Sequence, residues 1–433
     1  MRIIMDKHTH GHGRPPTGLE HSRTAVRVAL PLLLAVALLT GLGLALLWPN
    51  AGEAAKVIER VPFAGPGTIF VEGEVVSVDT GCGDGTQPRT GAATSGADPD
   101  RSCLTIGIGI TSGPDTGRVI DVPARGSLAS SGLQPRDTVE LLGAPRAEPP
   151  AGDPRASDGA ASERYSYSIS GIHRGLALVV LSALFLVVLL AVGRLRGLLA
   201  LGALALSGGV ILAFVLPAIV TGAPGALVGI VGSFAIVFII LYPVHGPNLR
   251  TTAALVGTLC GILITAGIST LAVHATRLSG LGDEAAARLS GVAGSIDFRG
   301  MLTCAIIIAG LGVLNDVTIT QASAVWELRA AAPHLGRGEI AKRAMRIGRD
   351  HIASTVYTIV FAYAGASLGV LILLALTDRP LLSTLTGDDL VTEIVRTLCG
   401  SIGLVLAMPI TTWIAAAFLP PVETGTETAA QLE

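Results

Sequence analysis

The stretch GLALVVLSALFLVVLLAVG, residues 175–193, decides the class of this 433-residue chain. It contains one serine and no charge, and at about 1.5 Å per residue it is long enough to cross ~30 Å of hydrocarbon as a helix. Seven such runs lie between residues 172 and 420, and one more precedes them at residues 29–48. The sequence therefore predicts a polytopic α-helical membrane protein with about eight spans.

Composition agrees with a protein whose main solvent is lipid. Half of the residues are hydrophobic, 14% are charged and the mean hydropathy is +0.63, a balance unlike that of water-soluble globular chains. The net charge of −2 gives no electrostatic basis for binding nucleic acid. The lipid bilayer is the expected partner, and the richness in Arg, Ala and Gly is typical of a bacterial protein.

The apolar runs give the positions of the spans. We expect them at residues 27–48, 172–193, 197–217, 224–243, 251–273, 301–325, 352–376 and 396–418.

Orientation follows from the basic residues of the short loops, which stay in the cytoplasm. The loop between the sixth and seventh spans is the most basic of them. If this loop is cytoplasmic, eight spans place both termini in the cytoplasm and residues 50–170 outside it. The sequence thus predicts a multi-pass protein of the bacterial plasma membrane. The basic residues of the loop are Arg329, Arg337, Lys342, Arg343, Arg346 and Arg349.

The first apolar run could be either a retained anchor or a cleavable signal peptide. Arg23 and Arg27 precede it, and small residues follow it at 51–55. Its length exceeds that of the usual signal peptide and favours the anchor. The expected organisation is a cytoplasmic tail with histidines at 1–26, an anchor at 27–48, a β-rich module at 50–170, a seven-helix membrane domain at 172–419 and a second tail at 420–433.

The module between the first two spans shows a β pattern. Short runs of alternating or β-branched residues, each bounded by Gly, Pro or Asp, predict five strands and a small barrel of oligonucleotide/oligosaccharide-binding type. A structural or partner-docking role is the main expectation for it, and ligand binding is the alternative. The runs are 68–78, 104–111, 118–122, 138–142 and 165–169.

The five cysteines fall into two groups. Cys82 and Cys103 bracket a Gly-rich insert of the module, where an oxidising compartment would favour a disulfide; two free thiols are the alternative. Cys260, Cys304 and Cys399 lie inside expected spans, where small apolar packing residues are the simplest interpretation.

The sixth span, MLTCAIIIAGLGVLNDVTITQASAVWELR at residues 301–329, carries Asn315 and Asp316 in an apolar context. An aspartate at mid-bilayer costs about 2.5–3.5 kcal/mol even on insertion scales, so it normally faces a bundle interior or a wet cavity. Helical spacing places small and polar residues on one line, which indicates a cation or proton pathway; a satisfied packing role for Asp316 is the alternative. The stripe comprises Ala305, Ala309, Gly312, Asp316, Thr320, Ser323 and Glu327.

Neighbouring spans carry small residues four apart, a spacing that lets helix backbones approach closely. We expect these faces to pack on one another and to shelter the polar stripe from lipid. The pairs are Gly225/Gly229, Gly257/Gly261 and Gly365/Gly369.

Two histidine-containing clusters are weaker signals. His245, Asn248 and Arg250 surround a Gly-Pro turn and could form a gate or proton relay, although an ordinary turn with a positive anchor explains them as well. His8, His10 and His12 alternate in the amino-terminal tail, where a weak transition-metal site or inert histidines are both conceivable. We expect no cofactor.

Five motifs in fixed order resemble the YibE/F-like family of bacterial multi-pass membrane proteins. The resemblance covers most of residues 172–419 and implies an integral membrane protein with an extracytoplasmic β-rich amino-terminal module. The motifs are VHGPNLRTTAALVGTLCGI from residue 244, IDFRGML from 296, NDVTITQASAVWEL from 315, IGRDH from 347 and EIVRTLCGSIGLVLAMPIT from 393.

The resemblance also places Asp316 at the acidic position of the family's corresponding helix. This chain departs from the family by its Gly-rich insert and by Arg136-Asp137, where related modules often have Gly-Asp. These departures concern the module and not the helices.

A transporter or permease with an intramembrane acidic site is the function that these features favour, with a small solute or ion as its partner and a homo-oligomer as a further expectation. The alternative is a membrane scaffold or envelope-associated protein whose β module docks a partner. The chain shows no catalytic constellation of high specificity, so an enzyme is not expected.

Overall fold

A computed structural model describes residues 23–50, 67–80, 104–146, 164–293, 296–376 and 386–420, together with residues 52, 65, 380 and 383. The chain divides into two compact units. One contains the first helix and the helices from residue 192 onward, and the other contains the β module and the start of the following helix. Cys82, Cys103, His8, His10 and His12 lie outside the described residues.

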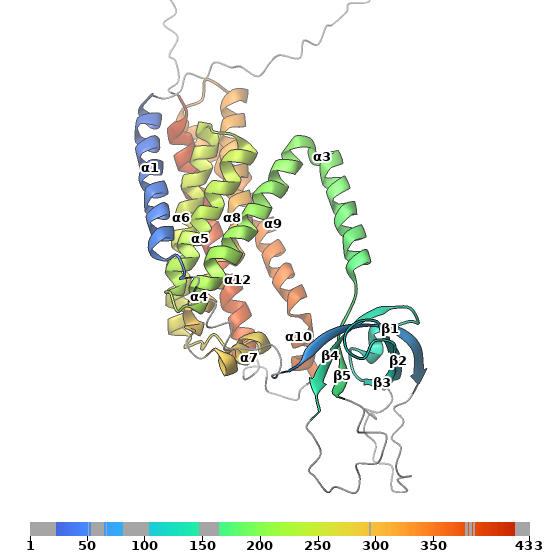
Figure 1. The fold of residues 1–433 in the computed structure, drawn as a ribbon. Coiled ribbons are helices and arrows are strands. Elements are labelled where there is room, and N and C mark those ends of the chain that lie inside the picture. The colour runs from blue at the N-terminus through green and yellow to red at the C-terminus, as the bar shows by residue number, and fades with distance from the viewer. Residues whose placement is uncertain are drawn as a thin grey trace, which may run out of the picture. The chain divides into compact units, whose positions relative to one another are not determined.

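The helical class predicted from the apolar runs is confirmed (Figure 1). Six helices are long and apolar enough to cross a membrane, and a seventh span results if α9 and α10, which meet at a 63° bend, are taken together. The spanning elements are α1 (Arg23–Leu46), α3 to α4 (Gly175–Val220), α5 (Gly225–His245), α6 (Leu249–Ala275), α8 (Phe298–Ala331), α9 (Arg337–Ala366) with α10 (Leu368–Leu376), and α12 (Asp388–Phe418).

The described residues give six or seven candidate spans and not the predicted eight, because residues 172–193 and 197–217 follow one another as two helices joined at a sharp break without an intervening loop. α3 (Gly175–Val210) continues through a π-helical turn, η4 (Ile211–Val215), into α4 (Leu216–Val220). The break expected between the two spans appears as a single residue, Arg194, with φ 51° and ψ −135°. These 46 residues contain about 69 Å of helix in total, enough for two crossings of ~30 Å of hydrocarbon.

A seam of small residues between α6 and α12 forms the centre of the bundle. The two helices are antiparallel and pair every fourth residue. If a Cβ atom were added to Gly257, it would collide with the side chain of Thr411. A Cβ atom added to Gly261 would lie 3.0 Å from the Cβ of Ala407. One turn further along, a Cβ added to Gly403 would collide with Thr265, and one turn beyond that the side chains of Ser269 and Cys399 are neighbours. Backbones this close maximise van der Waals contact, which is what holds helices together in lipid.

α8 packs on the same seam and on α5. A Cβ on Gly261 would lie 2.7 Å from Leu314 of α8, and the hydroxyls of Thr258 and Thr318 lie 2.6 Å apart between α6 and α8. On α5, Gly225 abuts the backbone of Gly300, and Gly229 approaches the Cα of Cys304. The close packing predicted for Gly257/Gly261 and Gly225/Gly229 is therefore confirmed.

The third small pair does not pack in this way. Added Cβ atoms on Gly365 and Gly369 would meet no atom within 4 Å among the residues that the structure describes. Both lie near the bend between α9 and α10, and α10 has no buried residue among those described. The prediction that this pair shelters the polar stripe is wrong for the described part of the chain.

One end of the bundle collects the arginines of the α8–α9 turn. Arg329 is 3% exposed, and its guanidinium donates to the carbonyls of Pro333 and Leu335 at 3.0 Å and of Pro420 at 3.3 Å. Arg337 donates to the carbonyl of Leu419. These cations satisfy carbonyls beyond the carboxyl end of α12, where the helix dipole is negative. Since α6 is antiparallel to α12, the turn before α6 lies at this end as well.

The β module is a half-barrel of five antiparallel strands in the order β3-β2-β1-β4-β5. Strand β3 approaches β5, so the sheet curls toward closure, as in the partly open barrel predicted from the sequence. Alternating inward residues such as Val71, Val75, Ile106 and Ile108 form its core. The strands are β1 (Ile69–Thr80), β2 (Leu104–Ile110), β3 (Val119–Ala124), β4 (Thr138–Pro145) and β5 (Tyr165–Ile172), which confirms the five predicted runs.

Arg136, at the turn into β4, has φ +78°. This left-handed conformation is one that glycine adopts freely and other L-residues adopt at a cost of about 1–2 kcal/mol. The Arg-Asp departure noted in the sequence thus falls on a strained backbone position.

We predict that Gly403→Ala destabilises the helical unit by about 1–3 kcal/mol, because its new methyl group must displace Thr265. Gly267→Ala on α6, where an added Cβ meets nothing within 4 Å, is the matched control. It should be neutral or raise stability by about 0.5–1 kcal/mol through helix propensity. Thermal unfolding of both variants in detergent measures the difference. Equal effects would contradict the seam.

We predict that Arg136→Gly stabilises the half-barrel by about 0.5–1 kcal/mol. This net value is the free energy gained by relieving the backbone strain, minus the larger conformational entropy that glycine loses on folding. The measurement is the urea concentration at which a pulse of protease cleaves residues 67–172 in the full-length protein. Arg125→Gly is the control, since Arg125 is not among the positive-φ residues, and it should destabilise. A loss of stability in Arg136→Gly would show that no strain is stored there.

Candidate functional site

The polar stripe of α8 lies on the face that points away from the seam. Asp316, Thr320 and Glu327 are exposed, and Ser323 is half-buried with its hydroxyl donating to the carbonyl of Ile319 at 2.7 Å. One helical turn before Asp316, a Cβ atom added to Gly312 would meet no atom within 4 Å among the described residues. The described residues therefore bring Asp316, Thr320 and Glu327 onto one open face and do not cover it. The prediction that neighbouring helix faces shelter this stripe is wrong for the described part of the chain, because the small-residue faces of α5, α6 and α12 pack on the other side of α8.

The opposite side of α8 explains this arrangement. Leu314, Val317, Thr318 and Gln321 are buried against α6, α9 and α12, so the helix cannot rotate its carboxylate inward without exposing them. α8 begins at Phe298 and ends at Ala331, which places Asp316 about 27 Å from one end and 22 Å from the other. The carboxylate thus sits near the middle of the helix.

Asn315 sits at the edge of this face. Its side chain is half-buried, and its Oδ1 is shielded from solvent and accepts no hydrogen bond from the part of the chain that the structure describes. An unsatisfied buried acceptor costs about 1–3 kcal/mol. A ligand bearing a proton, or a cation, would satisfy this oxygen.

A second polar group on α8, Gln321, was not singled out from the sequence. It is 3% exposed and donates from Nε2 to Thr412 Oγ1 of α12 at 2.7 Å and to the carbonyl of Ala344 of α9 at 3.0 Å. A Cβ on Gly348 would lie 2.9 Å from its Oε1. The amide thus joins three helices. Its signal in the sequence is a glutamine inside an apolar span.

The turn between α5 and α6 is held by Asn248. Its Oδ1 accepts from the backbone N–H of Thr251 at 2.9 Å, and its Nδ2 donates to the carbonyl of His245 at 3.1 Å. This is an amino-terminal helix cap. The contacts assign Asn248 to the turn, and a gate formed with His245 and Arg250 remains a prediction.

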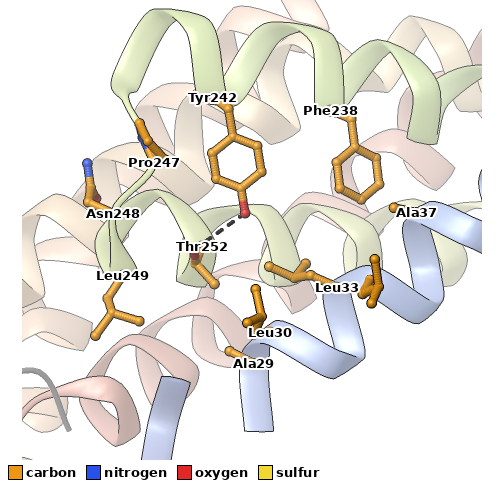
Figure 2. Close-up of a pocket in the computed structure, with 11 residues that line it drawn as sticks. Ala29, Leu30, Leu33, Ala37, Phe238, Tyr242, Pro247, Asn248, Leu249 and Thr252 are labelled. Carbon is orange, nitrogen blue, oxygen red and sulfur yellow. Dashed lines mark hydrogen bonds between the residues drawn. The ribbon is translucent and has the colours of Figure 1, made fainter. Parts of the chain in front are cut away.

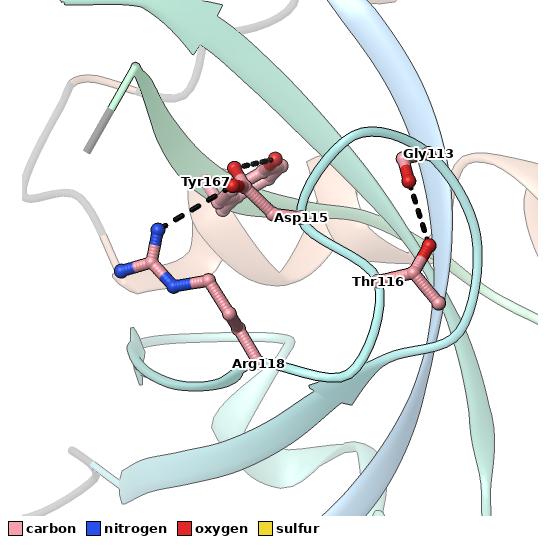
Figure 3. A network of polar contacts seen from close by, with 5 residues as sticks. All are labelled: Gly113, Asp115, Thr116, Arg118 and Tyr167. Atoms are coloured by element: carbon pink, nitrogen blue, oxygen red, sulfur yellow. Dashed lines mark hydrogen bonds and ion pairs between the residues drawn. The ribbon is translucent and has the colours of Figure 1, made fainter. Parts of the chain in front are cut away.

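The half-barrel carries its own polar network (Figure 3). Asp115, in the loop between β2 and β3, accepts from the hydroxyl of Tyr167 on β5 at 2.7 Å and pairs with Arg118 at 3.4 Å. Burial raises the pKa of the Tyr167 hydroxyl, and the hydrogen bond to Asp115 raises it further. The network fastens the loop to β5, so its role is structural.

Metal-binding groups are not assembled in the described residues, which hold no cluster of three or more His, Cys, Asp or Glu side chains placed around a common point. Of the cysteines that the structure describes, Cys304 and Cys399 are buried and Cys260 is half-buried, all as free thiols. Their predicted packing role agrees with these positions.

The sequence model of one family, described as YibE/F-like protein, matches residues 181–421, more than half of the chain. The chain belongs to the YibE/F-like family. The match runs from α3 to the end of α12 and so includes the seam and the polar face of α8. The resemblance read from the five motifs is confirmed. Comparison with curated proteins and with solved structures returns no match.

We predict that Tyr167→Phe destabilises the half-barrel of this YibE/F-like protein by about 1–2 kcal/mol at neutral pH, through loss of a hydrogen bond to a carboxylate. The pKa of Tyr167 is raised on folding, so its contribution is complete below the ordinary tyrosine pKa of about 10 and is lost as pH rises above it. Variant and wild type should therefore converge above about pH 10.

The measurement is urea-dependent proteolysis of residues 67–172 in the full-length protein at increasing pH. Tyr165→Phe, on the same strand, is the control and should follow the wild type. A pH-independent gap between Tyr167→Phe and wild type would contradict the assignment.

Proposed function

We propose that this multi-pass membrane protein of the YibE/F-like family is a permease in which the open face of α8 lines a route for a cation or proton. The observation that carries the proposal is the exposure of Asp316, Thr320 and Glu327 on one side of a helix whose other side is fully packed. Asp316 is the residue proposed to bind the ion, and the other two extend the polar line.

The energetics favour a polar environment for this face. A carboxylate facing hydrocarbon at mid-bilayer costs about 2.5–3.5 kcal/mol or more, and in the part of the chain that the structure describes Asp316 is exposed and not packed against a neighbouring helix. Water, or polar groups from a second copy of the chain, would remove that cost. The proposed route therefore runs along the outer surface of the described bundle and not through its centre.

The spacing suits stepwise movement of an ion. Asp316 and Glu327 are eleven residues apart, or about 16 Å along the helix, with Thr320 between them. Asn315 adds, beside Asp316, a shielded oxygen that accepts no hydrogen bond from the described residues. Carboxylate, hydroxyl and amide oxygens are the ligands that hard cations prefer.

The proposed orientation puts the end that gathers Arg250, Arg329 and Arg337 in the cytoplasm, since positive residues are retained there. If the run from α3 to α4 crosses twice, both termini lie on that side and the half-barrel lies outside.

We predict that Asp316→Asn abolishes ion flux through the purified protein without changing its abundance in the membrane, since an amide of the same shape keeps the packing and removes the charge. The measurement uses proteoliposomes loaded with dyes for H⁺, Na⁺ and K⁺ under an imposed membrane potential. Asp389→Asn, an exposed carboxylate in the first turn of α12, is the control and should leave flux intact. Unchanged flux in Asp316→Asn would overturn the acidic site.

The dense packing of α6, α8 and α12 favours a second candidate, a scaffold whose half-barrel docks a partner. In that case Asp316→Asn alters stability alone, no ion crosses the vesicle membrane, and deletion of residues 60–165 removes the cellular phenotype.

A further inference from the structure

A groove of about 480 Å³ lies between α1, α5 and α6, apart from the polar face of α8 (Figure 2). Leu30 and Leu33 of α1 form one side, and Phe238 and Tyr242 of α5 form the other. The volume is within the range of small-molecule sites, and the lining is almost entirely apolar. All three helices are candidate spans, so the groove opens toward the acyl chains of the bilayer.

The groove has a polar end. The hydroxyls of Tyr242 and Thr252 lie 3.4 Å apart in its wall, next to the turn at Pro247 and Asn248. Since the amide of Asn248 is occupied in capping α6, the two hydroxyls are the side-chain groups left to meet a ligand there. An occupant must therefore be apolar along most of its length and polar at one end.

Positive charge lies near that end. Arg250 directly follows Asn248 and Leu249, which line the groove. Arg250 and Arg196 are also close enough to His245, beside the same turn, to act on it electrostatically. Arg27 is exposed on α1, one turn before Leu30. Guanidinium groups bind phosphate through two parallel hydrogen bonds. The charge thus complements an anionic headgroup.

From this combination we propose that the groove between α1, α5 and α6 is a binding site for an anionic phospholipid, with an acyl chain between Leu33 and Phe238 and the phosphate near Arg250 and Arg196. A bound lipid would fill the space between the first helix and the bundle and so fasten α1 to α5. The site is independent of the permease proposal, because none of its residues lies on α8.

The test uses the full-length protein in nanodiscs of phosphatidylcholine doped with a phosphatidylglycerol that carries a photoreactive diazirine in one acyl chain. Illumination should label peptides of α1 and α5 around Leu33 and Phe238. Ala37→Phe, which places a ring in the groove, should reduce labelling several-fold. Ala35→Phe, on an exposed part of α1 that does not line the groove, is the matched control and should label like the wild type.

Recognition of the anionic headgroup is tested by removing the positive charges near the polar end of the groove. Arg250→Gln and Arg196→Gln should each reduce the preference for phosphatidylglycerol over a phosphatidylcholine probe about fivefold, whereas Arg250→Lys should retain most of it. Arg299→Gln, at the opposite end of the bundle, should change nothing. Arg196 is exposed, so its substitution leaves the packed core intact.

Two results would overturn the site. The first is labelling that Ala37→Phe leaves unchanged, which would place the lipid elsewhere. The second is equal labelling by the two probes in wild type and arginine variants, which would show chain insertion without recognition of the phosphate.

Discussion

The close approach of α6 and α12 is the constraint on which the rest of the helical unit depends. Along this seam a glycine on one helix repeatedly faces a threonine on the other, first Gly257 against Thr411 and then Gly403 against Thr265. The hydroxyl of Thr411 also donates to the carbonyl of Ala407 in its own helix at 2.8 Å, so this buried polar group has a partner at the contact. In lipid, where apolar surface alone does not drive association, this fit supplies the van der Waals contact that holds the helices together.

The seam determines where the polar face of α8 can point. Leu314 inserts beside Gly261, and Thr318 meets Thr258, which fixes the rotation of α8 about its axis. Gln321 fixes it a second time through α9 and α12. With both contacts in place, Asp316 is turned outward. The same packing that stabilises the bundle therefore presents a carboxylate to whatever lies beside it, water or a neighbouring copy.

Much of this architecture could be predicted from the sequence. Hydropathy identifies the spans because a helix in lipid needs about twenty apolar residues, and alternation identifies the strands because side chains alternate across a sheet. Helical spacing also placed Asp316, Thr320 and Glu327 on one line. The motifs were enough to indicate the YibE/F-like family that the comparison establishes.

Other features could not be predicted, for physical reasons. Small residues four apart permit close packing without specifying it, so Gly257/Gly261 and Gly365/Gly369 look alike in sequence although only the first pair meets a neighbour in the described residues. A polar stripe in a span does not reveal whether it faces its own bundle or a second chain, because both environments remove the cost of lipid. The roles of Gln321 and Arg329 depend on partners between 4 and 91 residues away along the chain.

The register of α6 against α12 is tested most directly by a disulfide across the seam. Ser269→Cys is introduced into a chain that retains Cys399 and has Cys82, Cys103, Cys260 and Cys304 replaced by alanine. After treatment with a membrane-permeant oxidant, we expect an intrachain disulfide joining residues 249–275 to 388–418, and none when Thr270→Cys is used instead. A bond through position 270, or none through 269, would contradict the seam and with it the outward placement of Asp316.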